Sequence, residues 1–286
     1  LGSASAATMN ITGTAVTFTG ENGSLYQPVY GSDDDLVLYL PFSRGNASSS
    51  TTIYDRSPYG NDGTCSGVDS DYGCNWTSGK YGNALFFDGT NDKIQIADAD
   101  ILSFGNGAAD SPFSVSAWVN LIADGDEKFI LSKWKAGSTT REWRFGIDSN
   151  EKVIFALYDE SEDIVVWTTG NSAEDVGVWI FVAATYDGTS GTTAMNGVTL
   201  YVNGVVISST ANNNAGYVAI ENTASVVDVG MYDTEKWFNG KIDEVMLYKR
   251  ALAPEEIRTH YLRGSGYGAM GAITADKFRV VNTSGS

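Results

Sequence analysis

The feature that most constrains this chain is a succession of short apolar or alternating runs, each ended by Gly, Asn, Asp or Ser. Examples are LVLYLPF from Leu36, FSVSAWVN from Phe113 and VWIFVAATYD from Val178. β-Branched and aromatic residues dominate these runs, and such runs with hairpin-type breaks are typical of antiparallel sandwiches and barrels. Asn203-Gly204 is the clearest turn, because an Asn-Gly pair accommodates the positive φ values of a two-residue hairpin. The pattern predicts an all-β chain.

One segment has the signals of a helix instead of a strand. Residues 254–262 begin with Pro254, continue with Glu255 and Glu256 at the positive end of the helix dipole, and are followed by Gly264 as a stop. No other segment alternates with the apolar runs in a β-α-β rhythm, so a mostly parallel α/β fold is not expected.

The charge balance excludes two classes of partner. Eighteen Lys and Arg against 35 Asp and Glu give a net charge of −17. A nucleic-acid phosphate backbone or an anionic lipid surface needs a basic stripe, so we expect neither partner. The longest apolar runs are far shorter than the roughly 20 residues that a membrane span requires, so we expect no span.

Two cysteines and several glycosylation sequons favour an extracellular location. Cys65 and Cys74 lie nine residues apart in a loop rich in Gly, Asp, Ser and Asn, which predicts a disulfide bond and therefore an oxidising compartment. The alternative is a pair of reduced thiols in a loop. Five Asn-x-Ser/Thr triplets are glycosylation candidates, at Asn10, Asn22, Asn46, Asn75 and Asn282.

Three segments together carry a family resemblance. They are DRSPYGNDGT from Asp55, GNALFFDG from Gly82, and KIDEV from Lys241 followed by ALAPEEI. As a set they resemble the laminin G-like, concanavalin A-like lectin and glucanase domains. The resemblance covers residues 33–264 and implies an antiparallel two-sheet jelly-roll β-sandwich. Residues 1–32 and 265–286 lie outside it and are expected to be extended, strand-like segments.

The same resemblance bears on catalysis. Related glucanases place acids in a Glu-x-Asp-x-x-Glu pattern on one strand, whereas the corresponding positions here hold Lys241 and Met246. The single histidine, His260, lies on the expected helix with no serine elbow nearby. We therefore expect a protein that is not an enzyme.

A structural calcium ion is the metal that the resemblance implies, because laminin G-like jelly rolls often hold one through oxygen ligands from loops. Candidate ligands are Asp88, Asn91 and Asp92 in a tight acidic turn, together with Asp243 in the KIDEV segment. They converge only if the two strand ends are neighbours. The alternative is that these acids terminate strands, as Asp and Asn often do in turns.

Glycans are a second expected partner. Trp76, Trp134 and Trp237 lie close to loops with lysines beside two of them, and an aromatic ring on such a surface can stack on a sugar. The alternative is ordinary packing beneath the loops.

The two ends of the chain predict self-association. Each has a strand-like pattern, with Ile11, Val16 and Phe18 near the start and Ile273, Phe278 and Val280 near the end. A solitary strand needs a sheet edge, and pairing with the next copy would propagate a filament. The leading functional hypothesis is an extracellular structural or adhesive cell-surface subunit that assembles head to tail. The alternative is a monomeric carbohydrate-binding lectin module of a larger secreted protein.

Overall fold

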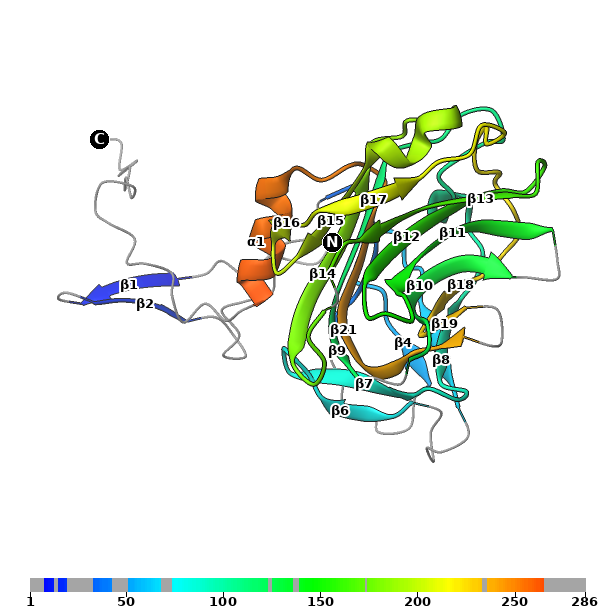
Figure 1. Ribbon diagram of the computed structural model, residues 1–286. Helices are drawn as coiled ribbons and strands as arrows, with labels where there is room; N and C mark the ends of the chain where they lie inside the picture. The colour runs from blue at the N-terminus through cyan, green and yellow to red at the C-terminus, as the bar shows by residue number, and fades with distance from the viewer. Residues whose placement is uncertain are drawn as a thin grey trace, which may run out of the picture.

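A computed structural model describes residues 8–12, 15–19, 33–42, 51–67, 74–122, 125–135, 139–172, 174–232 and 236–264. Two large antiparallel sheets face each other as a sandwich (Figure 1), which confirms the predicted jelly-roll class. The Asn203-Gly204 turn is also confirmed, since both residues have positive φ, 51° and 75°.

The first sheet has nine strands in the order β17-β13-β12-β11-β10-β18-β8-β5-β4. In chain order they are β4 (Thr52–Ile53), β5 (Gly63–Ser66), β8 (Lys93–Ile96), β10 (Lys128–Lys135), β11 (Thr140–Ile147), β12 (Val153–Asp159), β13 (Ile164–Gly170), β17 (Ser209–Asn212) and β18 (Val227–Val229).

The second sheet has eight strands. They are β3 (Leu36–Leu40), β6 (Trp76–Ser78), β7 (Asn83–Asp88), β9 (Phe113–Leu121), β14 (Trp179–Tyr186), β15 (Val198–Val202), β16 (Val205–Val206) and β21 (Asn239–Tyr248). The order is β16-β15-β14-β9-β21-β7-β6. Along its other edge β21 pairs first with β7 and then with β3.

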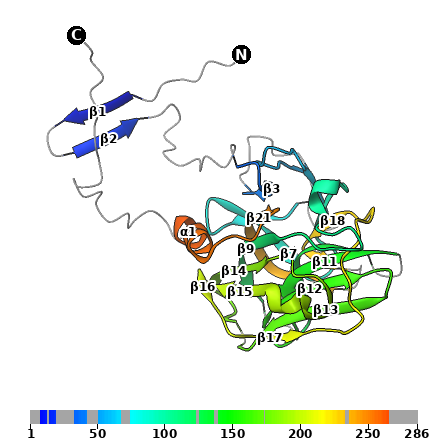
Figure 2. The same cartoon turned by 90° about the horizontal axis from the view of Figure 1, so that it is seen from above.

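The main core lies between the two sheets. Alternate residues of β12, namely Val153, Phe155 and Leu157, point into it, as the two-residue period of a strand requires. A second apolar cluster covers the outer face of the eight-stranded sheet, and it includes Ile257 and Tyr261 of helix α1 (Pro254–Gly264). The helix lies against this sheet (Figure 2). This helix confirms the prediction over 254–262. Within the described parts of the chain, no helix is long and apolar enough to span a membrane.

Four short elements complete the architecture. Two are 3-10 helices, η2 (Asp100–Leu102) and η3 (Gly191–Gly197), and two are the paired strands β19 (Met231–Tyr232) and β20 (Lys236–Trp237).

The N-terminal segment differs from the single strand that we predicted. Strands β1 (Thr8–Thr12) and β2 (Ala15–Thr19) form a two-stranded sheet of their own, in which Ile11 lies opposite Val16 and Met9 opposite Phe18. The chain reverses between the two strands, so each finds its partner within the segment. The C-terminal candidates Ile273, Phe278 and Val280 lie outside the described residues.

Candidate functional site

The DRSPYGNDGT segment is organised by one buried carboxylate. Asp55 Oδ1 accepts hydrogen bonds from the backbone N–H groups of Tyr39 and Ser57, each at 2.8 Å. Its Oδ2 accepts the N–H of Asn61 and the hydroxyl of Ser57. Both oxygens therefore hold the protein's own backbone, and the segment is a structural loop clamp.

The predicted disulfide is confirmed between Cys65 and Cys74. Among the sequons, half-buried Asn75 directly follows this bridge and Asn10 lies in β1. The other three, Asn22, Asn46 and Asn282, lie outside the described residues.

The predicted calcium ligands do not form one group. Asp88, Asn91 and Asp92 share the β7–β8 turn, where Asp88 Oδ1 accepts the Thr90 N–H at 2.8 Å and Asp92 Oδ2 accepts the Asp88 N–H at 3.2 Å. These carboxylates stabilise the turn, as Asp commonly does.

Asp243 is distant from that turn. Asn239 of β21 lies opposite Asp88, and four residues of strand, about 13 Å, separate Asn239 from Asp243. The described residues contain no group of three or more His, Cys, Asp and Glu side chains that could hold a metal ion. The four-residue calcium site therefore does not fit the structure, and calcium binding at the turn alone stays a prediction.

Buried Asp243 and half-buried Glu244 instead form a pair of acids where β21 changes partner. The register with β9 shifts between Asp243 and Met246, and Glu244 has a φ of 52°. Asp243 Oδ2 accepts the Tyr81 N–H at 2.9 Å, and the Tyr39 hydroxyl donates to Glu244 Oε2 at 2.6 Å.

Burial governs the protonation of this pair. Burial, followed by the charge of Glu244, raises the pKa of Asp243 to about 8. Burial also raises the pKa of Glu244 to about 7, against the opposing hydrogen bond from Tyr39. The pair therefore titrates close to neutral pH.

The three predicted glycan-contacting tryptophans have different surroundings. Trp134 is only 4% exposed, because β19 folds over β10 and brings Tyr232 to 5.4 Å from the Trp134 ring. Trp134 is thus wrong as a glycan platform. Half-buried Trp76 packs against the main core. Partly exposed Trp237 belongs to β20 and lies opposite Met231 of β19.

The outer face of the nine-stranded sheet carries a row of residues that directly oppose one another. Directly opposed residues of neighbouring strands share a face. This row points away from the core, because the adjacent Leu131, Phe145, Phe155 and Val166 point into it. Its members, from β18 to β17, are Asp228, Ser132, Arg144, Ala156, Trp167 and Asn212.

Trp167 is the exposed aromatic residue of this row. It is 36% exposed, more than any of the other six tryptophans. The small side chain of Ala156 on one side and polar Asn212 on the other leave the indole unobstructed by a large neighbour within the row. The alternating pattern of the IVVWTTG run could have identified Trp167, which we did not predict from the sequence. Val166 is a core residue, so the two-residue period of the strand turns Trp167 outward.

Arg144 and Asp228 supply charge further along the row. The Arg144 guanidinium lies 4.4 Å from the centre of the Tyr232 ring, a cation–π contact. Asp228 accepts a hydrogen bond from Gln95 Nε2 at 3.2 Å, and burial raises the pKa of Asp228. Arg144 lies two strands from Trp167, and buried Asp228 lies four strands from it, so the polar side chain directly beside the indole is that of Asn212. An aromatic ring next to an amide combines stacking with directional hydrogen bonding.

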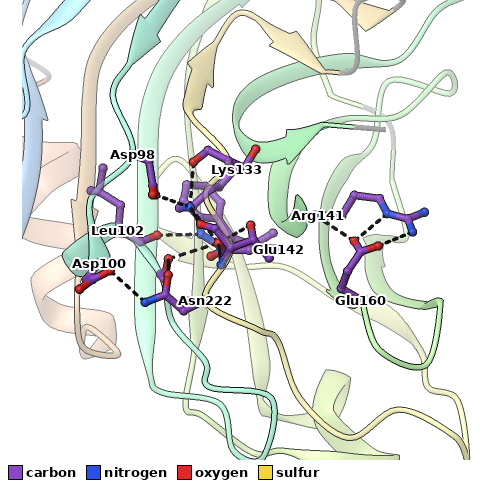
Figure 3. A network of polar contacts seen from close by, with 12 residues as sticks. Asp98, Asp100, Leu102, Lys133, Arg141, Glu142, Glu160 and Asn222 are labelled. Carbon is purple, nitrogen blue, oxygen red and sulfur yellow. Dashed lines mark hydrogen bonds and ion pairs between the residues drawn. The ribbon is translucent and has the colours of Figure 1, made fainter. Parts of the chain in front are cut away.

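A second polar cluster lies at one end of the core (Figure 3). Lys133 Nζ is 2.8 Å from each of four oxygens: Asp98 Oδ1, Glu142 Oε1 and the carbonyls of Thr223 and Ser225. The Lys133 and Glu142 side chains have no exposed surface, whereas that of Asp98 is 33% exposed. Burial raises the pKa of Glu142, and Lys133 opposes this shift.

The two facing antiparallel sheets define a jelly-roll domain. The chain belongs to the concanavalin A-like lectin/glucanase superfamily, whose laminin G-type model matches residues 88–258. No curated protein sequence matches this chain significantly.

Solved structures with the same fold come from toxins and from an arabinanase. The binding domain of Paraclostridial Mosquitocidal Protein 1 superposes with a TM-score of 0.57 at 16% identity, over 80% of this chain and 52% of that one. The botulinum neurotoxin serotype G binding domain gives 0.58 at 16%, over 80% and 51%. The chain thus spans about half the length of these two domains.

Domain 4 of AbnA, a GH43 extracellular arabinanase from Geobacillus stearothermophilus, was solved in complex with arabinotriose. It superposes with a TM-score of 0.54 at 19% identity, over 79% of this chain and 97% of that domain. At these identities the likeness establishes the fold alone.

Proposed function

We propose that the chain is a non-catalytic glycan-binding module of an extracellular protein, and that Trp167 is the centre of its binding face. The observation that carries the proposal is the exposed indole of Trp167 on the outer face of the nine-stranded sheet, with polar Asn212 directly beside it. The structural likeness to an arabinanase domain in complex with arabinotriose supports the same type of ligand. The disulfide supports an extracellular location.

The test is a binding measurement with the Trp167→Ala variant. A panel of plant, bacterial and animal oligosaccharides that includes arabinotriose is titrated while the intrinsic tryptophan fluorescence is followed. Binding of a panel member should weaken by at least about tenfold in Trp167→Ala, because burying an aromatic ring contributes about 1.5 kcal/mol or more.

Tyr54→Ala is the matched control. Tyr54 is 55% exposed and follows β4, the edge strand at the opposite side of the nine-stranded sheet from β17. Its removal should leave the affinity unchanged. Absence of binding to every sugar, or equal affinity of Trp167→Ala and the native chain, contradicts the proposal.

A second candidate function is the self-assembling surface subunit. The observation that favours it is the edge strand β16, whose residues Val205 and Val206 are 60% and 52% exposed. An exposed apolar strand edge is a surface to which another strand can add. The N-terminal strands β1 and β2 already pair with each other, so residues 265–286 are the better donor for such an addition.

A further inference from the structure

Lys133, Asp98 and Glu142 have an arrangement that goes beyond an ordinary ion pair. One amine nitrogen lies 2.8 Å from oxygens of two different carboxyl groups. One of these carboxyls, Glu142, is fully buried beside it, and the other, Asp98, is partly exposed in the segment that follows β8. Figure 3 shows both carboxyls directed toward Lys133.

We propose that Lys133 and Asp98 become joined by an intramolecular isopeptide bond, with Glu142 as the proton carrier. The amine of Lys133 is the nucleophile and the side-chain carbonyl carbon of Asp98 is the electrophile. The product is an amide cross-link between β10 and the segment after β8.

The step balances without any other reactant. The Lys133 ammonium passes a proton to Glu142 Oε1, which leaves a neutral amine. The amine attacks Asp98 Cγ and forms a C–N bond. The nitrogen then gives one of its two remaining protons to an Asp98 oxygen, and the other proton stays as the amide N–H. Glu142 returns its proton to the departing oxygen, which leaves as water when the C–O bond breaks. An ammonium and a carboxylate have then become one amide and one water, and Glu142 is a carboxylate again.

Glu142 has the surroundings that this role requires. Its Oε1 accepts hydrogen bonds from the Thr223 N–H and hydroxyl at 2.7 and 2.8 Å, which fixes the carboxyl group in place. Its Oε2 is buried and has no hydrogen-bond partner among the described residues. Burial raises the pKa of Glu142, which favours its holding a proton while the amine reacts.

The carbonyls of Thr223 and Ser225 orient the Lys133 amine. Each lies 2.8 Å from Lys133 Nζ, so the amine is held in place before the reaction. Holding reacting groups in contact removes much of the entropic barrier to a condensation. Trp143, which lies opposite Lys133 in the register, is fully buried beside this group.

The decisive experiment is the mass of the native full-length chain. The protein is produced in a host that adds no N-glycans, then reduced and denatured before mass spectrometry. We expect a mass one water, about 18 Da, below that of the sequence. Trypsin should release residues 94–128 joined to residues 129–135 through Lys133, without cleavage after Lys133. A mass equal to that of the sequence, or a bond from Lys133 to any other carboxyl group, overturns the proposal.

Three variants separate the chemistry from the folding. Asp98→Asn should lose ammonia, about 17 Da, and give the same cross-linked mass as the native chain. Glu142→Gln should fold and keep its full sequence mass, and thermal unfolding checks that it is folded. Lys128→Arg changes the other fully buried lysine of the described residues, which lies in the same strand as Lys133 and pairs with Glu151. This variant should leave the mass loss intact. Loss of water in folded Glu142→Gln contradicts the role of Glu142.

Discussion

Five charged side chains of the described residues have no exposed surface: Lys128, Lys133, Glu142, Asp159 and Asp243. Taking a charge out of water costs several kcal/mol, and an ion pair offsets that cost only when further hydrogen bonds complete the geometry. Asp159 shows how this is done, since its Oδ2 accepts the Val218 N–H at 2.8 Å and its Oδ1 accepts the Glu162 N–H at 3.0 Å. Buried charge in this protein fastens loops to strand ends.

The acid pair of β21 predicts a pH dependence of stability. Both carboxyls have a higher pKa in the folded chain than in the unfolded chain, so the folded state holds more protons between about pH 4 and pH 8. Stability due to these groups is fully present below the unfolded pKa values. It is lost as pH rises, by at most about 1.4 kcal/mol per pH unit for each group.

Glu244→Gln should make the melting temperature fall less steeply than in the native chain from pH 5 to pH 8. The amide oxygen can still accept the hydrogen bond from Tyr39, and the Glu244 charge that raises the Asp243 pKa is removed. Glu255→Gln, an exposed position in the first turn of α1, is the control. Superimposable pH profiles of Glu244→Gln and the native chain would show that the pair is not titrating in this range.

At the scale of elements, the clamp around Asp55 should be a major contributor to stability. Asp55→Ala leaves the buried N–H of Tyr39 and the half-buried N–H groups of Ser57 and Asn61 without their acceptor, and an unsatisfied buried group costs about 1–3 kcal/mol. Water can reach the two half-buried groups, so we expect a loss of about 2 kcal/mol or more in the free energy of unfolding, measured with urea.

Asp34→Ala is a suitable comparison, because Asp34 is exposed and accepts the Tyr59 hydroxyl through its backbone carbonyl alone. This variant should unfold at nearly the native urea concentration. Equal midpoints for Asp55→Ala and the native chain would refute the clamp.

The strands were readable from the sequence because alternation reports directly on burial. The run KVIFALYD became β12, with Val153, Phe155 and Leu157 in the core. The hairpin turn at Asn203-Gly204 was equally local. Features that depend on strand order were not readable. Asp243 and Asp88 lie on paired strands, yet register places them about four residues apart.

The candidate site was predicted less well for the same reason. Trp134 has lysines on both sides in the sequence and reads as surface, but β19 covers it from a segment nearly a hundred residues later. Lys133 reads as an exposed strand residue until Glu142 and the 223–225 segment surround it. Long-range covering of this kind leaves no periodic trace in the sequence.

At the scale of the whole molecule, the two large sheets use strands between Leu36 and Tyr248 alone. Deleting residues 1–24 should therefore leave the melting temperature of the sandwich nearly unchanged.

If the self-assembly proposal holds, the native chain forms filaments in electron micrographs and deletion of 265–286 abolishes them while the sandwich stays folded. If light scattering shows that the native chain and the truncated chain are both monomeric at the same concentrations, the self-assembly proposal is contradicted. Glycan binding then stays as the proposed function of the module.

The pairing of β3 with β21 has a consequence for how the chain reaches its native state. Leu40 lies opposite Val245, so one of the first strands of the sandwich finds its partner only after some two hundred residues have been made. Contacts of such large sequence separation make folding slow, on the scale of milliseconds to seconds or longer. A chain emerging from a ribosome or a secretion channel thus holds an unpaired, mostly apolar β3 until its last strand arrives. Newly made protein is most vulnerable to aggregation during that interval, and a chaperone that shields Leu36–Leu40 would act at the point where the fold is still open.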